Sequence, residues 1–229
     1  MKFAILAAGE GSRLAQEGVE LPKPLVAING EAMIDRLIRI FMECVAEEIV
    51  IITNNLTTLT QNHIRLLQQT NDKLKMVVKT TPSSMHSFYE LMPLLGKGKF
   101  CLTTVDTIFR EDEFKKYIDE FEQFEGQGLF AVTDYIDDEK PLYIATDEDM
   151  NITAFLDSEP QKFISGGIYS LTDAAFPTLT KSIEEGKSRM RNFQRQLIAD
   201  GLRIKAYKFS KILDVDHASD IAKAEEFLR

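Results

Sequence analysis

The sequence predicts an α/β fold: a Rossmann-like, three-layer α/β/α arrangement in which a mixed sheet has helices on both faces. The first observation is an alternation of strand-like and helical segments, at intervals of roughly 20 to 25 residues, through residues 1–134. The second is a change of pattern after residue 134, where strand-like runs are separated by turn residues. We therefore expect a parallel sheet with right-handed crossover connections, followed by a small antiparallel layer.

Each expected element has its own signal in the sequence, either a short apolar run or apolar residues at helical spacing. In the first half, strands are expected at residues 2–7, 47–53, 74–80, 99–106 and 128–134, and helices at 31–46, 56–69, 84–95 and 111–124. In the second half, strands are expected within 142–156 and at 162–171, 202–209 and 212–216, with helices at 172–199 and 218–228. Ligands of parallel α/β sheets bind where strands end, so Gly9, Asn54 and Asp106 should face one crevice.

Length and composition limit the kinds of protein this chain can be. With 229 residues and no linker-like or repeated segment, residues 1–229 are expected to form a single domain. The net charge of −9 argues against binding to nucleic acid or to anionic membranes. Cys44 and Cys101 lie in apolar surroundings and are expected to be buried, reduced thiols. No apolar run approaches the length of a membrane span, and no signal-peptide pattern precedes the first strand, so we expect a cytoplasmic protein.

The stretch "ILAAGEGSRL" at residues 5–14 carries the main functional signal. It does not complete a dinucleotide fingerprint, because Leu14 stands where the third glycine is needed, and the chain has no Walker A triplet. It is followed by "LPKPLVAING" at residues 21–30. Gly9 and Gly11 allow the backbone to approach an anion, and Arg13 and Lys23 add positive charge. Together the two stretches predict a site for a polyphosphate.

This long pattern resembles the signature of the nucleotidylyltransferase family that activates sugar phosphates and related alcohol phosphates. The resemblance implies that residues 1–134 bind the nucleotide and residues 135–229 form the acceptor side. It assigns nucleotide binding to Leu6, Ala8, Gly9, Gly11, Ser12, Arg13, Ser83 and Ser84. It assigns catalytic roles to Arg13, Lys23 and Asp106, with Lys23 neutralising charge on the α-phosphate during attack.

The resemblance also implies a Mg²⁺ site made of aspartates. Asp106 in "CLTTVDTIF" stands at the family's first metal position, although Val105 replaces the usual glycine. Asp214 and Asp216 in "ILDVDHASD" stand at the second, and strand alternation puts both on one face, so both could reach one cation. Asp216 is favoured as the ligand. Alternatively, Asp106 could cap the following helix. Carboxylates and phosphates together suit Mg²⁺, whereas no cluster of cysteine and histidine argues for zinc.

The acceptor side departs most from the family pattern. "KFISGGIYSL" resembles the strand that meets the acceptor, which implicates Gly166 and Gly167. The family's E-K-P lysine is missing from "LDSEPQKF", and Lys162 or Arg191 are the candidates to replace it. His86 is either an acceptor contact or a residue of the helix face. His217 is either a residue at a helix start or a substrate contact.

The resemblance implies transfer of a nucleotidyl group from an NTP to a sugar 1-phosphate, with release of pyrophosphate. One alternative keeps the fold and is a cytidylyltransferase acting on a phospho-alcohol, such as phosphocholine or a polyol phosphate. The stretch "SSMHS" looks more like that branch, so CTP or UTP is favoured. A second alternative is a non-catalytic domain that senses nucleotides. The sequence makes no prediction of oligomeric state.

Overall fold

The computed structural model describes residues 1–137 and 140–229. Nine strands form the main sheet: β1 (Lys2–Ala7), β4 (Ile49–Thr53), β5 (Leu74–Val78), β6 (Lys99–Thr104), β8 (Gly128–Thr133), β9 (Tyr143–Thr146), β10 (Ile152–Leu156), β11 (Phe163–Thr172) and β12 (Ile204–Phe209). The helices are α1 (Ser12–Gln16), α2 (Met33–Glu43), α3 (Thr58–Gln68), α4 (Ser84–Leu95), α5 (Glu111–Gln123), α6 (Phe176–Glu184), α7 (Met190–Ala199) and α8 (Ala218–Phe227). Shorter elements are η1 (Lys23–Leu25), β2 (Ala27–Ile28), β3 (Glu31–Ala32), β7 (Thr107–Ile108), η2 (Asp173–Ala175) and β13 (Leu213–Asp214).

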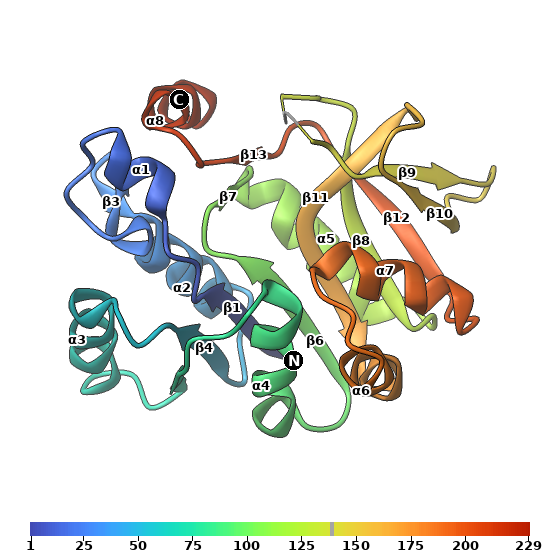
Figure 1. Cartoon of the computed structure of the whole chain (residues 1–229), viewed down its shortest axis with the longest axis horizontal. Helices are drawn as coiled ribbons and strands as arrows, with labels where there is room; N and C mark the ends of the chain where they lie inside the picture. Colours follow the sequence, from blue (N-terminus) through green and yellow to red (C-terminus); the bar gives the residue numbers. More distant parts are fainter. Residues whose placement is uncertain (138–139) are drawn as a thin grey trace.

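The sheet is mixed, as predicted. Strands β5, β4, β1 and β6 lie side by side and are parallel, with Ile5 opposite Ile51 and Phe3 opposite Cys101. Strand β11 pairs antiparallel with β6 on one side, and with both β8 and β9 on the other. The expected parallel series therefore ends at β6, because β11 stands between β6 and β8 (Figure 1). The antiparallel hairpin of β9 and β10 continues this same sheet.

The alternation of side chains along β1 explains why it lies at the centre. Ala4 and Leu6 point to one face, where they join the core formed by α4, α6 and α7. Phe3 and Ile5 point to the opposite face, where they join the core formed by α2, α3 and α5. A strand whose residues are buried on both faces needs a nearly continuous apolar run, which is what "KFAILA" provides.

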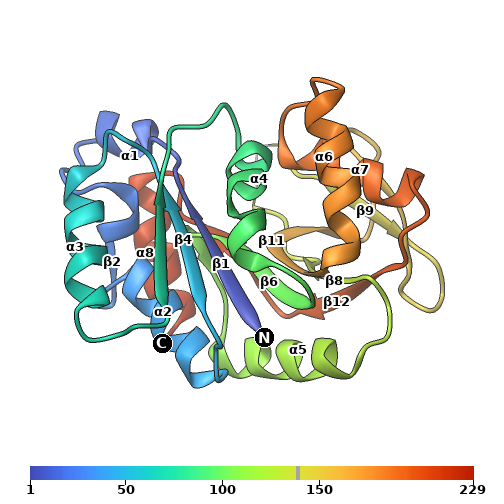
Figure 2. The same ribbon diagram turned by 90° about the horizontal axis from the view of Figure 1, so that it is seen from below.

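The C-terminal helix returns to the first half of the chain. Figure 1 and Figure 2 both show α8 next to α1, at the opposite end of the molecule from α6 and α7. Its Ala224 packs in a small core with Leu14, Val26 and Val215. The division of the sequence at residue 134 is therefore not a boundary in space, and residues near 216 reach the loop that follows β1.

One predicted helix was wrong in its extent. Residues 172–199 form β11's last residue, η2 and two helices, α6 and α7, instead of one continuous helix. The chain turns between them, where Gly186 has φ +68° and Arg189 has φ +72°. The predicted thiols are confirmed as free cysteines, with Cys101 buried and Cys44 half-buried. Among the described residues, no helix combines the length and the apolar character needed to cross a membrane.

Candidate active site

A cavity of about 480 Å³ opens where β1 and β6 end, next to the start of α4. It collects all of the residues that the sequence assigned to the nucleotide and to catalysis. Its lining residues are Leu6, Ala8, Gly9, Glu10, Gly11, Ser12, Arg13, Lys23, Pro24, Thr81, Pro82, Ser83, Ser84, Ser87, Thr104, Val105, Asp106 and Asp216. The sequence reasoning missed Thr81 and Ser87, whose hydroxyl groups lie 2.6 Å apart. The run of hydroxyl residues in "TTPSSMHS" was an available signal for them.

The buried side chain of Asn54 anchors the loop after β1 by hydrogen bonds to its backbone. Its Nδ2 donates to the carbonyl oxygens of Ala8 and Gly9, at 3.2 Å each. Its Oδ1 accepts the backbone N–H groups of Leu56 and Thr57, at 2.9 Å each. The sequence placed Asn54 on the crevice, whereas the structure buries it beneath the loop. It therefore shapes the nucleotide loop without lining the cavity.

Four charged side chains meet at the cavity wall. The Lys23 ammonium contacts the Asp106 carboxylate and lies 2.7 Å from Asp216 Oδ1. The Arg13 guanidinium lies 2.9 Å from Asp216 Oδ2. Burial acts to lower the pKa of Lys23, but the two carboxylates outweigh burial and raise this pKa overall. Burial likewise opposes ionisation of Asp216, yet Lys23 and Arg13 hold its pKa below the usual value. Lys23 and Asp216 are therefore both charged near neutral pH.

Asp214 has a different environment from Asp216. Its Oδ1 accepts a hydrogen bond from Thr107 Oγ1 at 3.2 Å, and Thr107 is in turn 2.6 Å from Thr104 Oγ1. The side chain is exposed to solvent. Desolvation by the surrounding protein, and then the negative charges of Asp106 and Asp216, raise the pKa of Asp214. Asp214 is thus held by a buried threonine, while Asp216 is held by cations.

The donor set fits Mg²⁺ better than zinc. In residues 1–137 and 140–229, no three acidic, histidine or cysteine side chains gather as a group that could hold a metal ion. One ion held by Asp106, Asp214 and Asp216 together is therefore not what the structure supports. Asp106 and Asp216 converge on one point, the Lys23 ammonium. Mg²⁺ commonly uses one or two carboxylates and takes its other ligands from phosphates and water, which matches this pair.

The start of α4 gives the cavity a polar wall. Ser83, in an extended conformation, precedes the helix, and Ser84 is its first residue. Ser83 Oγ lies 2.9 Å from His86 Nδ1 and accepts the backbone N–H of Arg189 at 3.3 Å. His86 is absent from the cavity lining and contacts Ser83 instead. The backbone N–H groups at this helix start are suited to a polar or anionic ligand.

Packing against neighbouring protein atoms explains why Gly166 and Gly167, the two predicted acceptor contacts, are glycines. Gly167 has φ +72°, and a Cβ there would lie 2.9 Å from Thr107 Oγ1. A Cβ on Gly166 would overlap with Ile212 Cδ1 and lie 3.1 Å from the carbonyl oxygen of Ala131. The close approach that these glycines allow is to neighbouring protein atoms, and neither lines the cavity.

The two residues predicted to replace the family's E-K-P lysine, Lys162 and Arg191, lie outside the cavity. The Lys162 ammonium is over the ring of Phe163, 5.1 Å from its centroid. Arg191 pairs with Asp157 at 2.6 Å, and Arg195 occupies the other oxygen of that carboxylate at 2.7 Å. Neither Lys162 nor Arg191 lines the cavity.

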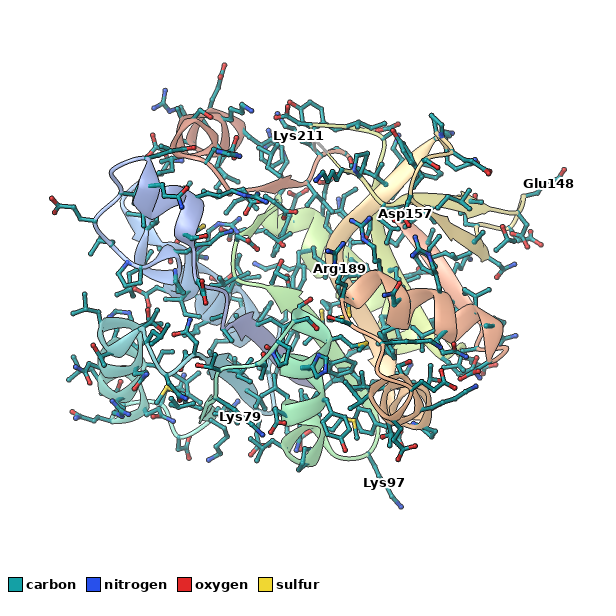
Figure 3. The ribbon with its side chains drawn as sticks, in the orientation of Figure 1. Lys79, Lys97, Glu148, Asp157, Arg189 and Lys211 are labelled. Atoms are coloured by element: carbon teal, nitrogen blue, oxygen red, sulfur yellow. The ribbon has the colours of Figure 1, made fainter. Side chains whose placement is uncertain are left out.

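Arg189 does not line the cavity either, but it contacts the cavity wall through its backbone, and the sequence reasoning did not single it out. It stands at the start of α7 (Figure 3). Its backbone N–H donates to Ser83 Oγ at the cavity wall. Within the described part of the chain, its guanidinium has no ion-pair or hydrogen-bond partner. The available signal was the basic run from Lys187 to Arg191. The sequence does not show which of these residues comes near the cavity, because that depends on the turn between α6 and α7.

Two alternatives from the sequence are decided by neighbouring helices. Helix α5 begins at Glu111 and is preceded by Arg110, so the interpretation of Asp106 as its cap is wrong. His217 precedes α8 and forms a capping box with Asp220. Its Nδ1 lies 2.6 Å from Glu17 Oε1, so His217 is a helix-start residue.

The fold and the cavity define a class of enzyme that transfers nucleotidyl groups. Residues 2–229 match the family described as nucleotidyl transferase, and the chain belongs to that family. A curated relative is the bifunctional IPC transferase and DIPP synthase of Aquifex aeolicus (strain VF5), 23% identical over 236 residues. That match covers 98% of this chain and 51% of the relative, so the chain spans about half of the relative's length.

Solved structures share the fold at low sequence identity. An inositol-1-phosphate CTP transferase from T. maritima has a TM-score of 0.81 and 18% identity, covering 100% of this chain and 97% of that one. A putative glucose-1-phosphate thymidylyltransferase from Bacillus anthracis has a TM-score of 0.85 and 19% identity, covering 100% and 95%. A UDP-glucose pyrophosphorylase from Acinetobacter baumanii has a TM-score of 0.79 and 15% identity, covering 98% and 91%. The predicted fold class and enzyme class are therefore confirmed.

Proposed function

We propose that this nucleotidyltransferase joins CTP or UTP to the phosphate of a sugar or polyol, in a Mg²⁺-dependent reaction that releases pyrophosphate. An oxygen of the acceptor phosphate attacks the α-phosphorus of the NTP. The bond from that phosphorus to the pyrophosphate oxygen breaks, and pyrophosphate leaves with its electron pair. A phosphate monoester is already a nucleophile, so no side chain has to remove a proton. Catalysis then rests on positioning and on charge neutralisation.

The observation that carries this proposal is the meeting of Lys23 and Arg13 with Asp106 and Asp216 at one cavity wall. Two cations next to a glycine loop suit a triphosphate, and Lys23 is placed to neutralise charge that develops around the α-phosphate. Asp106 and Asp216 are the residues that would hold Mg²⁺. When bound there, Mg²⁺ would supply a Lewis acid that stabilises charge on the phosphate oxygens.

The cavity also bears on the class of acceptor. Of the described residues that line it, none is aromatic, and eight are serine, threonine or aspartate: Ser12, Thr81, Ser83, Ser84, Ser87, Thr104, Asp106 and Asp216. Recognition of a trimethylammonium group commonly uses aromatic faces, whereas hydroxyl groups are bound by polar side chains of this kind. A sugar or polyol phosphate is therefore favoured over phosphocholine. We assign the acceptor phosphate to Arg189, a cationic residue whose backbone N–H donates to Ser83 Oγ at the cavity wall.

Pyrophosphate release tests the proposal directly. Each of four NTPs would be assayed with glucose 1-phosphate, inositol 1-phosphate and phosphocholine, with and without Mg²⁺. We expect release with CTP or UTP and a sugar or polyol phosphate. Release with phosphocholine alone would contradict the acceptor class, and no release with any pair would favour the nucleotide-sensing alternative.

Two variants link the activity to the cavity. Asp106→Asn should abolish most of the release. Asp134→Asn is the matched control, because that carboxylate pairs with Lys208 at 2.5 Å outside the cavity and should leave the rate unchanged.

A further inference from the structure

The Lys23 ammonium stands between the two carboxylates that would hold the metal. It contacts Asp106, and it lies 2.7 Å from Oδ1 of Asp216. The lysine side chain is only 11% exposed, and the Asp106 side chain is only 18% exposed. This ion pair is therefore shielded from bulk water, where charge-assisted contacts are stronger than at the surface.

These contacts leave little carboxylate charge for a second cation. Arg13 occupies the other oxygen of Asp216, Oδ2, at 2.9 Å. Two cationic side chains thus neutralise two anionic ones. A divalent cation that bridges Asp106 and Asp216 would compete with the Lys23 ammonium, because the lysine already holds Asp106 Oδ2 and Asp216 Oδ1.

A bound triphosphate would change this balance. Arg13 and Lys23 both line the cavity beside the glycine loop, within reach of a ligand that fills it. Phosphate oxygens compete well for guanidinium and ammonium groups. If the two cations move to the phosphates, the carboxylates of Asp106 and Asp216 are released at the moment when phosphate oxygens become available as further metal ligands.

We infer that Lys23 keeps the metal-binding carboxylates self-neutralised in the resting enzyme, so that the divalent cation enters with the nucleotide and not before it. This inference rests on the proposed function, since it takes Asp106 and Asp216 as the metal ligands. It gives Lys23 a second role besides its contact with phosphate. By linkage, metal and nucleotide must raise each other's affinity by the same factor.

The test measures metal binding without turnover. Mn²⁺ would be titrated into the nucleotide-free protein, and free Mn²⁺ followed by its paramagnetic resonance signal. Lys23→Met keeps the stem that packs on Gly11 and removes the charge. It should bind Mn²⁺ about 10- to 100-fold more tightly than the unaltered protein, the range expected when a competing charge-assisted contact is removed. Lys23→Arg keeps the charge and should bind as weakly as the unaltered protein.

Three further variants locate the effect. Lys79→Met is the matched control, because Lys79 pairs with Glu90 at 2.7 Å outside the cavity and should change nothing. Adding Asp106→Asn to Lys23→Met should remove the gained affinity. Arg13→Met frees Asp216 Oδ2 from a side chain that is 60% exposed, so it should fold even if Lys23→Met does not, and it should also tighten Mn²⁺ binding.

The outcomes separate this inference from the proposed function. Adding a non-hydrolysable analogue of CTP or UTP to the unaltered protein should tighten Mn²⁺ binding. If it does, but Lys23→Met and Arg13→Met bind Mn²⁺ no more tightly than the unaltered protein, the inference is wrong and the metal site stands. If Mn²⁺ fails to bind even with the nucleotide analogue, the metal site falls, and the inference falls with it.

Discussion

Gly11 lies so close to Lys23 that a Cβ atom on Gly11 would be 2.9 Å from the Cβ of the lysine. Gly11 also has φ +63°, in the left-handed region that residues with a side chain rarely adopt. Both constraints act at the turn that leads into α1 and Arg13. Glycine at this position therefore lets the nucleotide loop rest directly on the stem of Lys23.

We expect Gly11→Ala to damage both stability and nucleotide use. The left-handed backbone alone costs about 1–2 kcal/mol for a residue with a Cβ, and the contact with Lys23 adds to it. Urea unfolding should show this loss, and the KM for the NTP should rise. Gly9→Ala is the control for stability, because a Cβ there meets no atom within 4 Å and should change the free energy of unfolding by less than about 0.5 kcal/mol. Equal stability of the two variants would contradict this account of Gly11.

The hydroxyl group of Tyr117 joins α5 to two strands in the core. It donates to the carbonyl oxygen of Leu129 at 2.6 Å and accepts the backbone N–H of Ser170 at 2.9 Å. Burial raises the pKa of this phenol well above its usual value, so the hydroxyl keeps its proton. Tyr117→Phe should lower the free energy of unfolding by about 1–3 kcal/mol, because it leaves buried backbone groups unpaired. Tyr207→Phe, which removes a hydroxyl from a partly exposed ring, should cost less in the same urea titration, and an equal cost would contradict the assigned role.

The three aspartates should differ in their effect on turnover. Asp106→Asn and Asp216→Asn should each lower kcat on the order of 100-fold or more, the scale seen when one electrostatic contact to the transition state is lost. Asp214→Asn should cost less, since an asparagine can still accept the hydrogen bond from Thr107. Initial rates of pyrophosphate release at saturating substrate measure all three. A larger loss of kcat from Asp214→Asn than from Asp216→Asn would mean that Asp214, and not Asp216, is the metal ligand.

The local parts of the fold and of the site could be predicted from the sequence. The strand ending at Ala7 and the glycine loop after it are encoded within a dozen neighbouring residues, since apolar period and turn chemistry are short-range signals. The break between α6 and α7 was also visible, at Gly186, but the surrounding apolar residues suggested one continuous helix. A glycine inside a helical pattern is a weak signal unless something fixes its left-handed conformation.

The long-range parts could not be predicted from local patterns, and only the family resemblance placed the distant Asp106 and Asp216 at one metal site. Lys23 and Asp216 are 193 positions apart, and they meet because β13 pairs with β7 and Val215 N–H donates to the carbonyl of Asp106 at 3.1 Å. That register depends on the whole sheet. The alternation of a strand places Asp214 and Asp216 on one face, but it does not say that one is held by Thr107 and the other by cations. The insertion of β11 between β6 and β8 likewise follows from packing and not from any local pattern.

Asp200 provides a test of how pH acts on the α6–α7 hairpin. Its carboxylate accepts from Lys181 Nζ at 2.7 Å, Thr178 Oγ1 at 2.9 Å and Gln196 Nε2 at 2.6 Å. The hydrogen bond from Lys181 is the largest influence on Asp200 and lowers its pKa. Burial acts in the opposite direction but is weaker, so the pKa of Asp200 lies below the usual value. Since the folded pKa is the lower one, this carboxylate stabilises the fold fully above the unfolded pKa of about 3.9, and its contribution is lost as pH falls through the folded pKa.

We therefore expect Asp200→Asn to lower the free energy of unfolding by about 1 kcal/mol at pH 7, a value kept small because part of the side chain is exposed and its charge is screened. The difference from the unaltered protein should shrink as pH is lowered from 5 to 3. Urea titrations across this range measure it, with Asp119→Asn, an exposed carboxylate on α5, as the control that should show little pH-dependent difference. A deficit for Asp200→Asn that stays constant down to pH 3 would mean that hydrogen-bond geometry, and not the charge of Asp200, stabilises the hairpin.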